Sequence, residues 1–480
     1  MAEDMHDLVI RGAGLVTTEG LQTADLAVRG GRIHAIGPGA DGPARRVITA
    51  KGRLVTPGGI DPHAHVEQRS GMGLMNADTF ETAHRAALFG GTTSVISFAA
   101  QSKGAALSDT VAAYRALAER GAMADHAFHI IVTDPDVAGL EGDLAGLAAA
   151  GNRTLKLFTT YAIRLEDAAI LRLMAVARDL GMMVCVHAET DAILTHAKAR
   201  LLAAGLTAPK YHAPSHPRLA EIDAVERICR FAEFLDAPTM IFHVSTTEGV
   251  AAVRAARARG APVAAETCTH YLFQTAAVLD RPGMEGAKWM CSPPQRTEAD
   301  QEALWEGLAD GTLALVSSDH APFRFDATGK LAAGPEVPFP AIANGMPGLE
   351  PRMPLLFDAM VSRGRLGVEA FVRLTATSAA EIYGLTGKGR IAEGDDADLV
   401  IWDPARRHRY GADDLHDNVG YNPFEGVEIT GFPETVILRG QVAVEDGRLL
   451  AAPGSGLMIA RPACGLRPTG RRAPELDVAG

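Results

Sequence analysis

The stretch Thr56–His65, TPGGIDPHAH, decides the fold, because it places two histidines directly after an apolar segment. The apolar run Leu54–Ile60 is predicted to be a β-strand, and side chains two residues apart on extended chain share a face. His63 and His65 are therefore expected to point the same way. Imidazole nitrogens are ligands for zinc and similar metals. The pair predicts one side of a metal site at the end of a strand.

Four more polar side chains lie in, or directly after, short apolar runs that are predicted to be strands. They are Lys156 in TLKLF, His187 after MMVCV, His243 after TMIF and Asp319 after TLALVSS. Imidazole and carboxylate groups supply the nitrogen and oxygen ligands that divalent metals take. Six candidates at five strand ends favour a metal centre over a scatter of buried histidines.

The middle of the chain alternates strand-like and helix-like segments eight times. Continuous apolar strands separated by Ala- and Leu-rich helical segments indicate a parallel sheet that is buried on both faces. Eight such units predict an α/β fold, a (β/α)8 TIM-like barrel, whose active site lies at the carboxyl ends of the strands. Every candidate ligand falls at such an end. The predicted strands are Val55–Ile60, Ser94–Phe98, Phe128–Val132, Thr154–Phe158, Met183–His187, Met240–Val244, Val263–Glu266 and Leu313–Ser318.

Both ends of the chain contain short strands with glycine or proline between them, and neither end has enough strands to form a sheet comfortably alone. Together they are predicted to form one small β-sandwich domain. The expected division is residues 1–56 and 384–464 for that domain, 57–383 for the catalytic barrel and 465–480 for an extended tail. The predicted terminal strands are Leu8–Ile10, Asp25–Val28, Arg32–Ile36, Asp398–Trp402, Gly426–Thr430, Glu434–Leu438 and Gln441–Glu445.

Composition excludes several classes of protein. The 480 residues are 47% apolar, enough for a large core, and the net charge of −12 with no Lys/Arg-rich block argues against nucleic-acid binding. No apolar run approaches the roughly 18–20 residues of a membrane span. The acidic start Met1–Asp4 lacks the layout of a secretory signal, and the five cysteines show no CxxC spacing. These features predict a cytoplasmic protein without a disulfide framework.

Lys156 and Tyr161 each have two interpretations on the residues alone. A free ammonium cannot bind a metal, because it has no lone pair. Lys156 is therefore either a salt-bridge residue at the barrel end or a lysine that carbon dioxide has converted to a carbamate. Tyr161 follows on the loop that leaves the same strand. It is either a surface tyrosine or a hydroxyl donor to an oxyanion.

Ten motifs spread over nearly the whole chain carry a family resemblance. The chain resembles the amidohydrolase superfamily, and more closely its dihydropyrimidinase and hydantoinase group. The motifs occur in the same order as in that group. They are TPGGIDPHAH (56–65), LKLFTTY (155–161), VCVHAET (184–190), FHVST (242–246), AETCTHYL (265–272), CSPPQR (291–296), SSDHAPF (317–323), IANGMPGLEPR (342–352), GRIAEGDDADLVIWDP (389–404) and NVGYNPFEG (418–426).

The resemblance implies a centre of two divalent metal ions, expected to be zinc. One ion is more buried and the other more exposed, and N6-carboxylysine at Lys156 bridges the two. The implied ligands are His63, His65 and Asp319 for the buried ion, His187 and His243 for the exposed ion, and Lys156 for both.

The resemblance also implies roles toward substrate. Asp319 matches the catalytic acid and base, and Tyr161 matches the tyrosine that stabilises the oxyanion. Ser292 and Asn344 match positions whose main-chain groups hold the cyclic amide. Proline and glycine neighbours of these two residues fix the backbone, so that its polar groups can face a ligand. His320 is a candidate for orienting a metal ligand.

The implied reaction is hydrolytic ring opening of 5,6-dihydropyrimidines or hydantoins to N-carbamoyl amino acids, by a hydroxide held between the two metal ions. The substrate is a small cyclic amide, and the resemblance implies a homotetramer or homodimer. Allantoinase and cyclic-imide hydrolase remain open as alternatives. Dihydroorotases have an arginine where this chain has Glu67, which disfavours that activity. Collapsin response mediator proteins share the fold as non-catalytic scaffolds but lack the ligands that are present here.

Two departures from the family pattern concern the pocket. Ala321 stands where many relatives have a cysteine, a change that should matter little to chemistry. The loop Glu67–Thr79, EQRSGMGLMNADT, differs more from the usual loop, which helps to shape the pocket for the ring substituent. Substrate preference and stereochemistry therefore stay open. Met72, Leu74 and Met75 either form an apolar wall of the pocket or pack the loop down.

Overall fold

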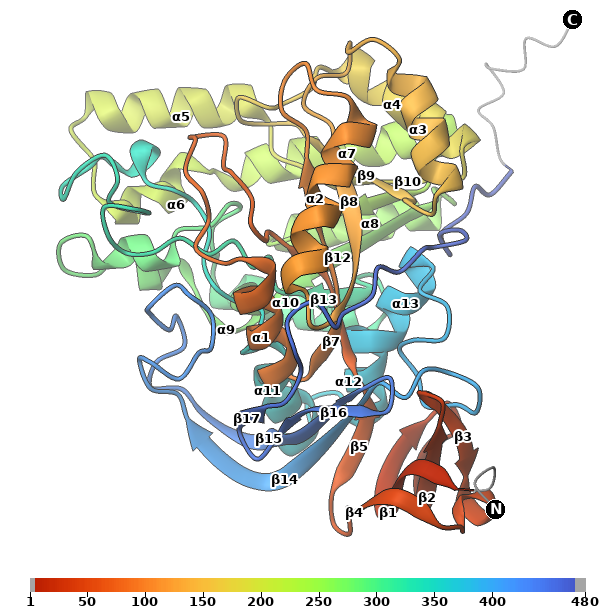
Figure 1. The fold of residues 1–480 in the computed structure, drawn as a ribbon. Helices are drawn as coiled ribbons and strands as arrows, with labels where there is room; N and C mark the ends of the chain where they lie inside the picture. The colour runs from red at the N-terminus through yellow and green to blue at the C-terminus, as the bar shows by residue number, and fades with distance from the viewer. Residues whose placement is uncertain (1–4, 471–480) are drawn as a thin grey trace, which may run out of the picture.

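An eight-stranded parallel barrel forms the centre of the protein, described here over residues 5–470 of a computed structural model (Figure 1). Its strands follow one another in chain order, and each pairs with the next. A bridge between Ala64 and His320 brings the two ends of the sheet together, so the barrel is nearly closed. The predicted barrel is confirmed. The strands are β6 (Gly59–Ala64), β7 (Thr92–Ala100), β8 (Asp125–Ile131), β9 (Thr154–Phe158), β10 (Met183–His187), β11 (Thr239–Ile241), β12 (Val263–Cys268) and β13 (Leu315–Ser317).

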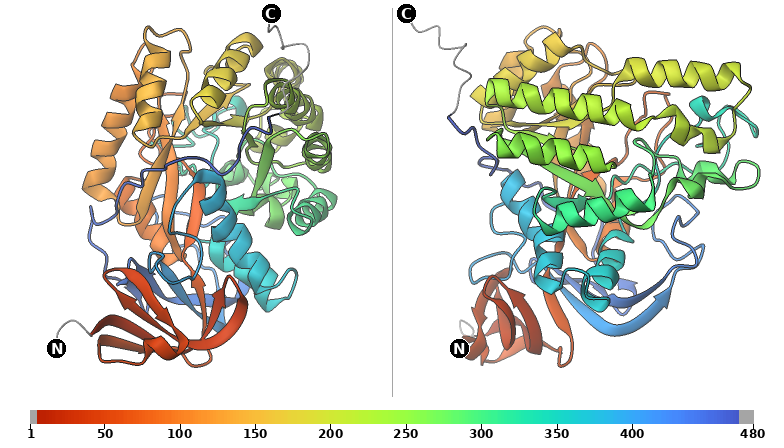
Figure 2. Two further views of the ribbon diagram at one scale, coloured as in Figure 1. Left: turned by 90° about the vertical axis from the view of Figure 1, so that its right-hand side faces the viewer. Right: turned by 180° about the vertical axis from the view of Figure 1, so that it is seen from behind.

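Helices cover the outside of the barrel (Figure 2). The first helix begins at Phe80 because Thr79 caps it. The Thr79 hydroxyl accepts from the Thr82 backbone amide, and the Thr82 hydroxyl accepts from the Thr79 backbone amide. The helices are α1 (Phe80–Phe89), α2 (Leu107–Gly121), α3 (Leu140–Ala149), α4 (Asp167–Asp179), α5 (Asp191–Ala203), α6 (His212–Ser215), α7 (Arg218–Leu235), α8 (Thr247–Ala258), α9 (Thr269–Phe273), α10 (Glu298–Ala309), α11 (Arg352–Phe357), α12 (Val368–Val372) and α13 (Ser378–Tyr383).

Strands from both ends of the chain form one second sheet, which lies below the barrel in Figure 1. The sheet is mostly antiparallel, and the two halves of the chain meet where β5 pairs with β14. Trp402 of β14 joins this sheet to the barrel, because its ring stacks on Phe357 at 4.4 Å between centroids. The strands are β1 (His6–Thr17), β2 (Gly20–Arg29), β3 (Arg32–Ile36), β4 (Ala44–Thr49), β5 (Leu54–Pro57), β14 (Leu399–Arg409), β15 (Glu428–Leu438), β16 (Gln441–Glu445) and β17 (Arg448–Leu449).

The predicted first barrel strand, Val55–Ile60, is wrong. Its first half is the end of β5 in the terminal sheet, and the barrel strand begins only at Gly59. The chain changes sheets at Gly58, whose amide donates to the Asp398 carbonyl at 2.8 Å. A Cβ at Gly58 would lie 2.1 Å from the Thr93 hydroxyl, so only glycine fits the crossing. The sequence shows one continuous apolar run and hides the break.

The separate strands predicted at Gly426–Thr430 and Glu434–Leu438 are one long strand, β15. Pro433 lies between them, and it reads as punctuation in the sequence. β15 nevertheless continues through Pro433 with a register shift opposite β14. Such an irregularity is where a sheet accommodates proline.

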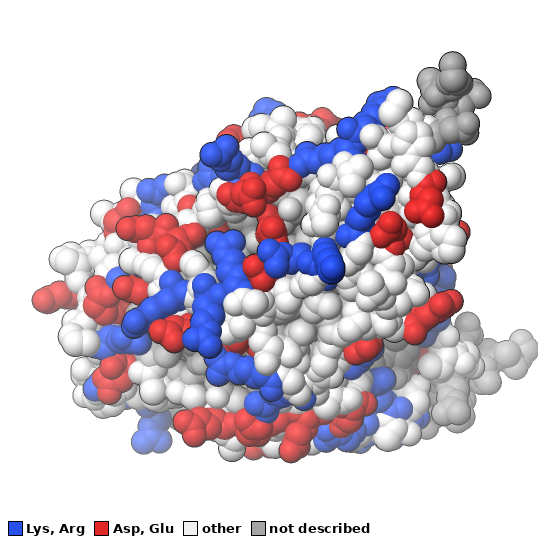
Figure 3. Space-filling view, turned by 90° about the horizontal axis from the view of Figure 1, so that it is seen from below, with Lys and Arg blue, Asp and Glu red and all other residues white. Residues whose placement is uncertain are grey.

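The expected acidic start at Met1–Asp4 and residues 471–480 of the expected tail lie outside the described residues. The part of the tail that is described, 465–470, has no helix or strand and is fixed to the barrel, since Thr469 and Gly470 donate to the Asp236 carboxylate. Among the described residues, no helix is long and apolar enough to cross a membrane. The face seen from below carries side chains of both charge signs, and neither sign covers it (Figure 3).

Candidate active site

The predicted metal ligands come together at the carboxyl ends of the barrel strands. His63 Nε2 lies 3.0 Å from Asp319 Oδ1, and His65 Nε2 lies 3.5 Å from the same oxygen. One donor atom from each of the three side chains falls within 4.8 Å of the other two, an arrangement that suits a shared cation. Burial alone would raise the pKa of Asp319. The neighbouring His63, together with hydrogen bonds from His63 and His65, outweighs burial and holds this pKa well below its usual range.

A second pair of predicted ligands adjoins this group. The rings of His187 and His243 lie 4.5 Å apart between centroids, and the His243 ring lies 5.4 Å from that of His63. Both residues of the pair are buried. The His243 Nδ1 atom is buried and has no hydrogen-bond partner among the described residues. The five candidate ligands, four histidines and one aspartate, therefore form one continuous cluster. At least one of its ring nitrogens, His243 Nδ1, is free to bind a metal.

Lys156 points into the same cluster with an ammonium that lacks a partner. The residue is 1% exposed, and its Nζ has no hydrogen bond within the described part of the chain. Its nearest ring is that of Phe242, with Nζ 4.0 Å from the centroid. Burial lowers the pKa of Lys156 to about 8, although Asp319 opposes that shift. Lys156 forms no ion pair within residues 5–470, so the structure does not support its interpretation as a salt-bridge residue. A buried amine with a lowered pKa and no partner fits a lysine that is carboxylated.

Backbone strain concentrates at the barrel mouth. His243, Asp319 and Tyr161 have φ of 40°, 46° and 73°, and Glu67 has φ of 49°. These four belong to the seven non-glycine residues with positive φ in the described chain. Side chains with a Cβ rarely adopt this conformation, and where they do, the strain is often at a functional site. Three of these four, His243, Asp319 and Tyr161, are residues that the motifs also single out.

Glu266 is a site residue that the sequence analysis missed. Glu266 lies within β12, two residues before its last residue Cys268, with Oε1 2.5 Å from His63 Nδ1. A carboxylate on one ring nitrogen fixes the tautomer and leaves the other nitrogen free to bind a metal. Glu266 is 0% exposed. A single acid in an otherwise apolar strand was the signal available in the sequence.

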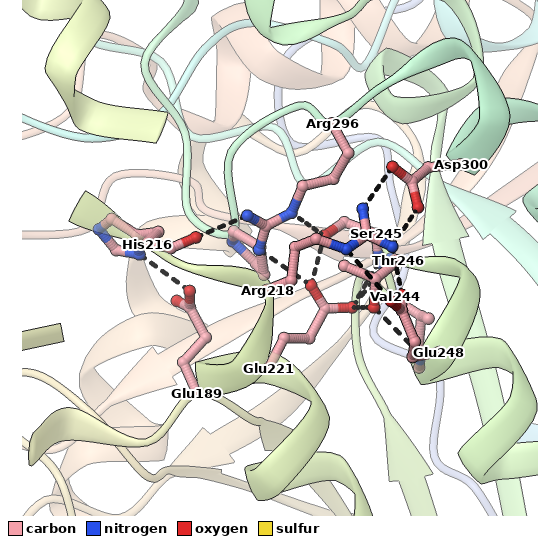
Figure 4. A network of polar contacts seen from close by, with 12 residues as sticks. Glu189, His216, Arg218, Glu221, Val244, Ser245, Thr246, Glu248, Arg296 and Asp300 are labelled. Atoms are coloured by element: carbon pink, nitrogen blue, oxygen red, sulfur yellow. Dashed lines mark hydrogen bonds and ion pairs between the residues drawn. The ribbon is translucent and has the colours of Figure 1, made fainter. Parts of the chain in front are cut away.

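Glu189 contacts a ring nitrogen of His187 as Glu266 contacts one of His63. The sequence analysis missed this residue too. Its two oxygens lie 2.9 Å from His187 Nε2 and 2.8 Å from His216 Nδ1. The contact occupies Nε2 of His187, so Nδ1 is the atom left for a metal. Figure 4 shows how the network continues: Arg296 donates to the His216 carbonyl at 2.6 Å and pairs with Glu221. The loop that carries Ser292 is thereby tied to the predicted ligand His187.

Two of the residues expected to hold substrate, Tyr161 and Ser292, lie beside the cluster. The Tyr161 side chain lies near Ser292, and its ring lies 5.3 Å from that of His187. Burial, assisted by the nearby Glu189 carboxylate, raises the pKa of Tyr161 well above its ordinary value. The phenol therefore stays protonated and can donate a hydrogen bond. Asn344 Oδ1 is buried without a partner in the described residues.

The loop Glu67–Thr79, which departs from the family pattern, is tied to the predicted ligand His65. Gln68 Oε1 lies 2.8 Å from His65 Nδ1, and Asn76 donates to the His65 carbonyl at 2.6 Å. Met72 and Met75 are 50% and 45% exposed, so the loop does not pack these side chains into the core.

Glu67 is engaged by the backbone of the first barrel helix. Its carboxylate accepts from the Phe80 amide at 3.2 Å, at the start of α1.

His320 touches Asp78, with Nε2 3.0 Å from Oδ2, and its carbonyl accepts from the His65 amide at 2.7 Å. Its side chain therefore supports the loop, and only its main chain contacts a predicted ligand.

Comparison with known proteins agrees with this geometry. Residues 54–443 match the model of the amidohydrolase family, so the chain belongs to the amidohydrolase family. The D-hydantoinase of Rhizobium radiobacter is 40% identical over 94% of this chain and 98% of its own length. The dihydropyrimidinase structure from Brevibacillus agri has a TM-score of 0.92 and 35% identity, covering 96% of this chain and 99% of its own. The structure named L-hydantoinase (dihydropyrimidinase) from Arthrobacter aurescens has a TM-score of 0.84 and 26% identity, over 95% and 100%.

Proposed function

We propose that this protein hydrolyses the ring amide of hydantoins or 5,6-dihydropyrimidines and releases N-carbamoyl amino acids. The observation that carries the proposal is the convergence of Lys156 with the histidine and aspartate cluster at one barrel mouth. The names of the relatives, D-hydantoinase and dihydropyrimidinase, support this substrate class. By the family resemblance we also propose a homotetramer or homodimer in the cytoplasm.

The residues present fit two divalent ions, expected to be zinc. His63, His65 and Asp319 would hold one ion, His187 and His243 the other, and Lys156 as a carbamate would join the two. Carbamate formation adds carbon dioxide to the neutral amine and releases one proton, and the lowered pKa of Lys156 favours the neutral amine. When bound, the ions would lower the pKa of a water molecule to near neutrality and polarise the ring carbonyl.

The side chains of this chain would do the remaining work. Asp319 would accept a proton from the attacking water and then deliver it to the leaving ring nitrogen. The protonated Tyr161 hydroxyl would donate to the oxygen on which negative charge develops. Main-chain groups of Ser292 and Asn344 would hold the amide of the ring in place. Glu189 would keep His187 in the orientation that leaves Nδ1 free.

Removal of metal tests the centre directly. The purified protein is expected to contain about two divalent ions per chain and to lose activity on chelation, because the ions activate both water and carbonyl. Elemental analysis and chelator titration measure this, and return of activity on adding zinc is the control. Full activity in protein that contains no metal contradicts the proposed centre.

A substrate panel tests the reaction class and the handedness. Relatives named D-hydantoinase share more of this sequence than the structure named L-hydantoinase does. The exposed Met72 and Met75 offer apolar surface on the loop that is tied to His65. We therefore expect 5-substituted D-hydantoins with apolar substituents to exceed their L-enantiomers in kcat/KM by roughly tenfold or more. Steady-state kinetics with each pure enantiomer checks this.

The same panel separates the alternatives. It includes dihydrouracil, unsubstituted hydantoin, allantoin, dihydroorotate and succinimide. Turnover of dihydroorotate is expected to be poor, since Glu67 supplies no positive charge for the substrate carboxylate. A clear preference for allantoin or succinimide over every hydantoin and over dihydrouracil replaces the proposed substrate class with allantoinase or cyclic-imide hydrolase.

A further inference from the structure

Lys330 is a fully buried lysine outside the metal cluster. The residue is 0% exposed, and its Nζ donates to the Ala343 carbonyl at 2.9 Å and to the Met290 carbonyl at 3.5 Å. No carboxylate forms an ion pair with it anywhere in residues 5–470. A buried cation without a counter-charge is unfavourable for folding, so its presence calls for another role.

The two carbonyls belong to the two segments that the proposed function assigns to substrate. Met290 lies two residues before Ser292, and Ala343 directly precedes Asn344. The segments also meet each other, because the Gly345 amide donates to the Met290 carbonyl at 2.8 Å. The Lys330 ammonium therefore lies at the junction of both segments.

The surroundings of this junction are apolar. Met290 packs in a buried cluster with Leu279, Val337, Phe339 and Ile342. Burial lowers the pKa of Lys330 to about 7, and only the Cys291 thiol opposes that shift. In such surroundings a hydrogen bond from an ammonium is stronger than it would be in water.

We propose that Lys330 is a positioning residue for ring opening, which locks the segments of Ser292 and Asn344 together and strengthens the main-chain groups that hold the substrate. This inference rests on the proposed function. The carbonyl of Ala343 and the amide N–H of Asn344 belong to the same peptide group. Donation by Lys330 to that carbonyl polarises the peptide, and the N–H of Asn344 becomes a better donor toward a ring carbonyl. Lys330 itself touches neither substrate nor the reacting atoms.

Lys330→Met separates this role from a structural one. The substitution keeps the length of the side chain and removes the charge. We expect kcat/KM on the best substrate of the panel to fall roughly 10- to 100-fold, the usual effect of losing a hydrogen bond to a charged group. The melting temperature should stay the same or rise, because replacement of a buried charge by an apolar group is often neutral or stabilising. Metal content should not change.

Lys288→Met is the matched control. Lys288 lies close by in sequence, but its ammonium pairs with Glu285 at 2.6 Å and donates to neither carbonyl. The Lys288→Met variant should keep the kcat/KM of the wild-type enzyme. Hydrogen exchange supplies a readout that does not depend on activity. In Lys330→Met the amides of 289–292, 295–296 and 342–346 should exchange faster, while the barrel strands keep their protection. Lys330→Gln retains a neutral donor and should recover part of the lost kcat/KM.

Either of two results overturns the proposal. One is unchanged kcat/KM in Lys330→Met together with unchanged exchange in both segments. The other is a lowered melting temperature with faster exchange throughout the barrel, which identifies a purely structural lysine. A wild-type enzyme that opens no cyclic amide refutes the proposed function instead, and the exchange experiment still decides whether Lys330 locks the two segments.

Discussion

Lys156→Ala is expected to abolish ring opening, with kcat/KM falling by roughly 10³-fold or more, because it removes the group proposed to join the two ions. The reason is electrostatic: a cationic ammonium between two dications is repelled, whereas a carbamate is attracted. Lys156 Nζ is buried beside the Asp319 cluster and has no hydrogen-bond partner within residues 5–470. Metal content should fall below about two ions per chain. Steady-state kinetics and elemental analysis of the same preparation measure both effects.

Chemical rescue is the control for that variant. Added short carboxylic acids, such as acetate or propionate, should partly restore activity to Lys156→Ala by supplying the missing carboxylate. They should do nothing for the wild-type enzyme. The carbamate itself can be detected by carbon-13 NMR after equilibration with labelled bicarbonate. A high-resolution map with an unmodified Lys156 beside two fully occupied metal sites contradicts the proposal.

The barrel could be predicted from the sequence because its inner strands are buried on both faces. The bounds of β9 and β10 were predicted to the residue, since each is a short, mostly apolar segment bounded by polar or glycine-containing loops. The first strand was misplaced because the sheet change at Gly58 depends on a close contact with Thr93, a residue that is distant in the sequence. Steric contacts of this kind leave no local pattern.

The candidate ligands could be predicted because each one follows an apolar run in a recognisable motif. The residues that orient them could not. Glu266 and His63 are 203 residues apart in the chain, and only the closure of the barrel brings them together. The burial of Lys330 could not be predicted either, since an isolated lysine in a loop is normally assigned to the surface. Its burial depends on the fold of two other segments.

Tyr161→Phe is expected to lower kcat by roughly 10²–10³, comparable to the loss of one oxyanion donor in other hydrolases. The substitution keeps the ring, which packs 5.3 Å from the His187 ring, and removes only the hydroxyl. KM should change less, because the hydroxyl acts mainly on charge that develops in the transition state. The fold should tolerate the change, since the strained φ of 73° at Tyr161 is a property of the backbone that phenylalanine shares.

Tyr410→Phe is the matched control for Tyr161→Phe. The Tyr410 hydroxyl is buried and makes no hydrogen bond with any described residue, and it packs in an apolar cluster with Leu355 and Phe424. Its loss should leave kcat and KM unchanged. Both variants are compared with wild type at saturating substrate, under conditions where ring opening limits the rate. An unchanged kcat in Tyr161→Phe makes that tyrosine a structural residue, and stabilisation of the oxyanion then falls to the metal centre alone.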